Sequence, residues 1–184
     1  SKTISFSLQS PATGAAIVHE YVLKPEDYMI DLNIKLNGTN QLLTQGTMNL
    51  VWQYAAHQQE SDISYEKQNT QIGYVEDGSF DYHTIGGRKS SKEFDEAVNW
   101  VGVRQRFFYA IMVAKNNFSS GRMEWTIPAD TSQKVVQSTA SMRIQVPAGN
   151  SSLIPLSFYY GPSEYHVLKQ YDMKFEKLVN LGQG

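Results

Sequence analysis

The stretch MIDLNIKL, residues 29–36, decides the fold of this chain. Apolar residues occupy its even positions, and polar residues stand at positions 31, 33 and 35. Alternation with a period of two is typical of a β-strand that buries one face and exposes the other. The stretch therefore predicts a strand of an antiparallel sheet.

The same pattern recurs along the whole chain. Ile4, Phe6 and Leu8 predict a strand with one buried face, and residues 48–52 and 142–146 repeat the alternation. Residues 107–114 are apolar on both faces and predict a central strand, and residues 153–160 predict another long strand. About ten such runs are expected, so the chain is predicted to be an all-β antiparallel sandwich.

Glycine, proline and asparagine separate these runs. Asn37-Gly38 lies between two strand-like segments and predicts a hairpin turn. Residues 58–68 predict a loop with one helical turn. Gly161-Pro162-Ser163-Glu164 is typical of a helix start, and it predicts a helical C-terminal segment over about 162–180. No repeat or linker interrupts the pattern, so residues 1–184 are predicted to form a single domain.

The composition excludes several classes of protein. The 184 residues carry 16 Lys and Arg against 18 Asp and Glu, a net charge of -2, which argues against a nucleic-acid partner. The chain has no cysteine, so it holds neither a disulfide nor a cysteine zinc site. The longest apolar run, residues 107–114, is too short for a membrane helix. The abrupt ends predict a soluble domain cut from a longer protein.

Groups that carry chemistry do not cluster in the sequence. The four histidines, at positions 19, 57, 83 and 166, lack the spacing that would bring metal ligands onto one helix face. Neighbouring carboxylates fall in polar, loop-like stretches, where solvation explains them. The sequence therefore predicts no catalytic residue, no cofactor and no metal.

The aromatic residues have two interpretations. They could line a sugar-binding face, because aromatic rings stack on pyranose rings, or they could fill the space between two sheets. The residues concerned are Trp52, Tyr54, Tyr74, Tyr82, Trp100 and Trp125.

Four segments, in order, resemble the large periplasmic domain of YidC-type membrane protein insertases, in the form found in Bacteroidetes. They are EYVLKPEDYMIDLNI (20–34), NWVGVRQRFF (99–108), FYYGPSEYHVLK (158–169) and LVNLG (178–182). The resemblance implies a β-supersandwich of the galactose-mutarotase-like kind, with a terminal helix packed on one sheet. It also implies a periplasmic domain of an inner-membrane protein, whose partners are Sec translocon subunits and nascent membrane proteins.

On this resemblance the domain is a non-catalytic accessory module that assists protein insertion and folding. Leu168 and Tyr171 are expected to be buried against a sheet, with Phe158 or Tyr160 nearby. This packing would couple the sandwich to a membrane segment behind it. The candidate coupling residues are Trp100, Phe107, Phe108, Phe158, Tyr160, Gly161, Pro162, Leu168 and Tyr171.

Two other functions remain open from the sequence. A carbohydrate-processing enzyme of the same fold would need paired histidines and a glutamate base that converge in space. A carbohydrate- or peptide-binding module would need a ladder of exposed Trp and Tyr on one sheet face.

Overall fold

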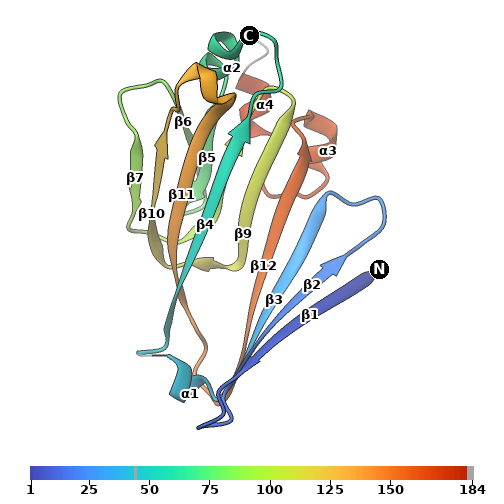
Figure 1. Cartoon of the computed structure of the whole chain (residues 1–184), viewed down its shortest axis with the longest axis vertical. Helices are drawn as coiled ribbons and strands as arrows, with labels where there is room; N and C mark the ends of the chain where they lie inside the picture. The colour runs from blue at the N-terminus through green and yellow to red at the C-terminus, as the bar shows by residue number, and fades with distance from the viewer. Residues whose placement is uncertain (44, 182–184) are drawn as a thin grey trace.

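A computed structural model describes residues 1–43 and 45–181, and these form two antiparallel sheets (Figure 1). The larger sheet has eight strands, in the order β1 (Lys2–Gln9), β2 (Ala16–Leu23), β3 (Met29–Asn37), β12 (Ser151–Pro162), β9 (Phe108–Phe118), β8 (Val98–Arg104), β5 (Gln71–Glu76) and β6 (Ser79–Thr84). The smaller has four, in the order β4 (Thr47–His57), β11 (Lys134–Gln145), β10 (Ser120–Thr126) and β7 (Ser91–Phe94). The predicted all-β sandwich is confirmed.

The deciding stretch forms β3, as predicted. Leu32, Ile34 and Leu36 are at most 5% exposed and point into the core between the sheets. Leu32 lies opposite Leu156 of β12, so one apolar row crosses the strands. The intersheet core therefore follows directly from the alternation of the strands.

The first strand forms, but its expected burial is wrong. Ile4, Phe6 and Leu8 are 51%, 61% and 73% exposed. Figure 1 shows β1 and β2 at the margin of the large sheet, away from β4 and β11. The smaller sheet has half as many strands and leaves this margin uncovered.

The hairpin expected at Asn37-Gly38 is also wrong. After Gly38, whose φ is 75°, the chain enters α1 (Thr39–Leu42) and then β4 of the other sheet. The left-handed glycine is present as the turn signal requires, but it starts a crossover between sheets. The turn predicted over residues 58–68 is α2 (Ile63–Gln68), and η1 (Asp130–Ser132) is a further single turn.

The C-terminal helix expected over 162–180 is divided. Pro162 is the last residue of β12, opposite Phe108, and the helices are α3 (Tyr165–Lys169) and α4 (Lys177–Leu181). Asp172 and Lys174 between them have φ of 53° and 66°, a left-handed conformation that ends a helix. Among residues 1–43 and 45–181, no helix is long and apolar enough to cross a bilayer.

Candidate functional site

Residues 163–181, here called the C-terminal cap, lie on the outer face of the eight-stranded sheet. Tyr159 of β12 faces the cap, whereas Phe158 and Tyr160 face the intersheet core. The sheet and the cap bury one apolar cluster, here called the outer-face cluster. Its buried members are Met29, Val75, Trp100, Tyr109, Ile111, Val113, Tyr159, Leu168, Phe175, Leu178 and Val179.

Trp100 anchors the middle of the cap. Its side chain is fully buried, and its indole Nε1 donates a hydrogen bond of 2.7 Å to the carbonyl oxygen of Met173. The Phe175 ring meets the indole edge to face, with 5.3 Å between centroids. A buried indole satisfies its one donor here by binding the backbone between α3 and α4, so it fixes that segment on the sheet.

Tyr159 and Tyr171 join the cap to the start of β3. Tyr171 packs edge to face on Tyr159 at 5.6 Å and donates a 2.6 Å hydrogen bond to Asp27 Oδ1. The same carboxylate oxygen accepts the Met29 amide at 3.0 Å. Desolvation, followed by the hydrogen bond to Asp27, raises the pKa of Tyr171 to about 12. The raised pKa keeps this phenol protonated, and able to donate the bond, to a higher pH than an ordinary tyrosine.

Leu168 lies where it was expected, but its neighbours differ. It is fully buried in the outer-face cluster, and Tyr171 is half-buried beside that cluster. Phe158 and Tyr160 instead pack toward Trp52 of the small sheet, whose indole donates to the Tyr160 hydroxyl at 3.2 Å. Successive residues of a strand point to opposite faces, so Tyr159 is the residue of β12 that meets the cap.

Gly161 and Pro162 form the joint between β12 and the cap. A Cβ on Gly161 would lie 2.8 Å from Cγ of Tyr28, so only glycine fits beneath that ring. The Pro162 carbonyl accepts the Tyr159 hydroxyl at 2.6 Å. The next residue, Ser163, receives a 2.9 Å hydrogen bond from Arg104 Nε. Hydrogen bonds from Tyr159 and Arg104 thus fix the chain at the point where it leaves the sheet.

The turn between β8 and β9 holds the other candidate residues. Phe107 is 60% exposed and lies outside β9, so its expected place in the central strand is wrong. Its backbone carbonyl nevertheless accepts the Ser163 amide at 3.0 Å. Phe108 is half-buried against the intersheet core. At this turn the backbone, rather than the phenyl rings, meets the cap.

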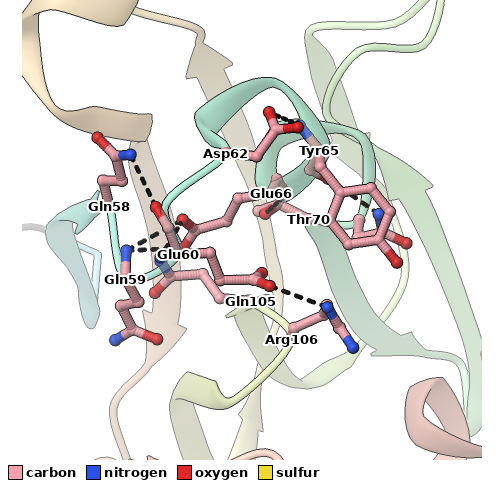
Figure 2. A network of polar contacts seen from close by, with 10 residues as sticks. Gln58, Gln59, Glu60, Asp62, Tyr65, Glu66, Thr70, Gln105 and Arg106 are labelled. Atoms are coloured by element: carbon pink, nitrogen blue, oxygen red, sulfur yellow. Dashed lines mark hydrogen bonds and ion pairs between the residues drawn. The ribbon is translucent and has the colours of Figure 1, made fainter.

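A buried carboxylate fixes the same turn to α2 (Figure 2). Glu66 is 1% exposed and accepts hydrogen bonds from the amides of Gln59 and Glu60 and from Gln105 Nε2, at 2.9–3.1 Å. Beside it, Arg106 pairs with Glu60 at 2.9 Å. The network ties the 58–62 loop, α2 and the β8–β9 turn into one unit.

The sequence did not reveal that two glycines, Gly73 and Gly102, make room for the Tyr109 side chain beneath the cap. A Cβ on Gly73 would lie 2.8 Å from the Tyr109 hydroxyl oxygen, and one on Gly102 would lie 2.7 Å from Tyr109 Cε1. Tyr109 is fully buried, its hydroxyl has no hydrogen-bond partner, and burial raises its pKa. Neighbouring strands place the two glycines opposite each other, a pairing that no local pattern reveals.

The described histidines stand on different elements, and no three His, Asp or Glu side chains of residues 1–43 and 45–181 gather as a metal site. His83 bonds the Tyr74 hydroxyl at 3.0 Å and stacks on Trp125, and burial lowers its pKa. Four of the six aromatics considered for sugar stacking are at most 9% exposed: Trp52, Tyr74, Trp100 and Trp125. These rings fill space inside the domain.

A family model described as the YidC periplasmic domain matches residues 1–183. The chain belongs to this family. The chain is similar over most of its length to proteins named Membrane protein insertase YidC. That of Parabacteroides distasonis is 28% identical over 182 residues, which cover 93% of this chain and 28% of the relative. That of Chlorobaculum parvum is 25% identical, covering 98% of this chain and 31% of the relative.

The relative from Phocaeicola vulgatus is 28% identical over 182 residues, which cover 92% of this chain and 29% of the relative. The chain therefore spans under a third of these curated relatives. Among solved structures, that of a provisionally assigned aldose 1-epimerase from Escherichia coli K12 covers 87% of the chain and 65% of its own, with a TM-score of 0.47 and 11% identity.

Proposed function

We propose that this chain is a non-catalytic periplasmic accessory domain of a bacterial inner-membrane protein insertase. The family match over residues 1–183 carries the proposal, and the relatives named as membrane protein insertases support it. The rest of such a protein would insert the clients, and this domain would assist their insertion and folding.

The proposed task of the C-terminal cap is mechanical. Its contacts combine packed aromatic and aliphatic side chains with hydrogen bonds, as in the pairs Trp100–Met173 and Tyr171–Asp27. Such a closely packed surface holds a segment in a fixed orientation, because closely packed interiors have low compressibility and transmit strain. The cap would therefore set how the sandwich is oriented relative to the rest of the proposed insertase.

The proposed partners are Sec translocon subunits and nascent membrane proteins. The experiment compares the full-length parent with a parent from which this domain has been deleted, each purified from membranes by the same affinity tag. We expect the intact parent to retain more translocon subunits or nascent membrane proteins, as measured by quantitative mass spectrometry. Equal recovery from both proteins would count against a partner-binding role.

A second measurement addresses the carbohydrate functions. The purified domain is incubated with aldoses, and their anomeric interconversion is followed by polarimetry. No acceleration over buffer is expected. Catalysed interconversion would overturn the non-catalytic assignment, and tight glycan binding would instead favour a carbohydrate-binding module.

A further inference from the structure

Strand β1 is an edge that the described parts of the chain leave open. It pairs with β2 on one side and ends the large sheet on the other (Figure 1). All eight of its residues are exposed. The strand contains no proline, and Lys2 is its one charged residue. Proteins usually protect such edges with charges, prolines or covering segments, because an open edge accepts another strand.

The backbone groups that face the open side follow from the register. The amide of Ser10 donates to the Ala15 carbonyl at 2.8 Å, directly beyond the pair of Gln9 with Ala16. Hydrogen-bonded and non-bonded pairs alternate along an antiparallel ladder. The even residues of β1 therefore bond to β2, and the amides and carbonyls of its odd residues, positions 3, 5, 7 and 9, point to the open side.

The side chains of β1 extend the inner face of the sheet. Ile4, Phe6 and Leu8 lie opposite Tyr21, His19 and Ile17 of β2, and these lie opposite Leu32, Ile34 and Leu36 of β3. Exposure rises along each row toward the edge: Leu36 is 1% exposed and Leu8 is 73% exposed. A shallow apolar groove runs along the margin, lined by Phe6, Ser7, Leu8, Ile17 and His19.

We propose that β1 pairs antiparallel with β1 of a second copy of the chain, about a two-fold axis through Phe6. In this register Phe6 faces its own copy, and Ile4 faces Leu8 of the second molecule. The hydrogen-bonded pairs are then Ser5 with Ser7, and Thr3 with Gln9. Directly opposite residues of a strand pair share one face, so the apolar rows of both molecules join.

A second copy fits this edge because the apolar residues of β1 are arranged symmetrically about Phe6, so the strand is complementary to itself. A register shifted by one residue would put the two apolar rows on opposite faces. A shift by two in one direction would place Lys2 against Leu8, and a shift by two in the other direction would place Ile4 against the polar Ser10. In the proposed register Lys2 lies beyond the paired residues, so no charge faces an apolar side chain. The strand supplies the complement of each of its own open groups, as an isologous interface requires.

The first test measures association of the whole 184-residue chain by sedimentation equilibrium, from about 1 µM to 1 mM. We expect a reversible dimer whose dissociation constant rises about tenfold or more in Leu8→Glu, because a charge then faces Ile4 of the second copy. Leu153→Glu is the matched control, since this leucine is 50% exposed and lies in β12, three strands away from the β1 edge. It should associate like the unmodified chain.

A second test reads the register. The natural chain has no cysteine, so a single introduced thiol reports its own position. Opposite residues of a non-hydrogen-bonded pair lie about 4.5 Å apart between Cα atoms, within reach of a disulfide. Oxidation should link Phe6→Cys to itself, leave Ile4→Cys unlinked, and link Ile4→Cys to Leu8→Cys when the two are mixed.

Several results would overturn the proposal. The first is a chain that stays monomeric throughout the concentration range, which would leave the edge to a different partner strand. The second is a dimer whose dissociation constant does not rise in Leu8→Glu. Self-linking of Ile4→Cys that matches that of Phe6→Cys would also overturn it.

Discussion

At the scale of single residues, the absence of a side chain at Gly102 shapes the outer face. Tyr109 lies across Gly102, and a methyl group there would also stand 3.0 Å from the Ala110 carbonyl oxygen. Tyr109 and Ala110 are both fully buried, so neither can move toward solvent. The Tyr109 ring thus occupies the space that a side chain at position 102 would otherwise fill.

Gly102→Ala is expected to lower the free energy of unfolding by about 1–3 kcal/mol, the usual cost of overpacking a core. Urea denaturation followed by circular dichroism measures it. Gly86→Ala is the control, because a Cβ at Gly86 meets no atom within 4 Å. Similar losses in both variants would show that the Tyr109 ring does not set the cost.

Whereas position 102 requires the absence of a side chain, position 66 requires a particular one, the buried carboxylate of Glu66. Its carboxylate accepts two backbone amides and the Gln105 side chain. In Glu66→Gln one acceptor oxygen becomes an amide donor that faces these donors. We expect the free energy of unfolding to fall by about 1.5–3 kcal/mol, because a hydrogen bond to a charged group is lost inside the domain. Urea denaturation measures the loss, and exposed Glu26→Gln should change little.

At the scale of elements, α3 is held by its apolar face. The helix has only five residues, too few to persist alone, and Leu168 is its one buried residue. Leu168→Ala should lower the free energy of unfolding by about 2–5 kcal/mol through the cavity it leaves. Leu153→Ala, at a half-exposed strand position, should stay within about 0.5 kcal/mol. Chemical denaturation of both variants decides whether α3 is anchored as described.

The bond from Tyr171 to Asp27 predicts a dependence on pH. The folded pKa of Tyr171 is raised to about 12 from an ordinary value of 10.0. The stabilisation is therefore complete below pH 10 and is lost as the pH rises through 12, because the unfolded phenol ionises first. The stability advantage of the unmodified chain over Tyr171→Phe should accordingly shrink in this window.

Urea denaturation at several pH values measures that difference. Tyr65→Phe, at a half-exposed tyrosine of α2, controls for the loss of one hydroxyl. An advantage over Tyr171→Phe that stays constant above pH 10 would show that this phenol does not hold its proton through the bond to Asp27.

At the scale of the whole molecule, the C-terminal cap and strand β1 contribute unequally to the stability of the folded domain. The cap covers Trp100, Ile111 and Tyr159, all fully buried, whereas every residue of β1 is exposed. A chain that ends at Pro162 should expose this apolar face, shift Trp100 emission to the red and bind a hydrophobic dye. A chain that lacks residues 1–9 should keep its folded core. Equal damage from both deletions would contradict this division.

The sequence alone was enough to predict much of this protein. Period-two alternation in β3 and in residues 142–146 predicted strands, since a strand must place successive side chains on opposite faces. Four spaced segments, from 20–34 to 178–182, pointed to the family that the matched residues 1–183 confirm. Both signals are local or carried by order along the chain, so they can be read without coordinates.

Other features were decided by tertiary structure. The alternation in β1 and the long run at 153–160 predict strands, but they do not show what covers each face. Tyr159 rather than Phe158 therefore meets the cap, and Leu8 stands exposed at the margin. The partners of Glu66 and the ring over Gly102 come from segments distant in sequence. The physical reason is that burial belongs to pairs of surfaces, and which surfaces meet depends on how the whole chain folds.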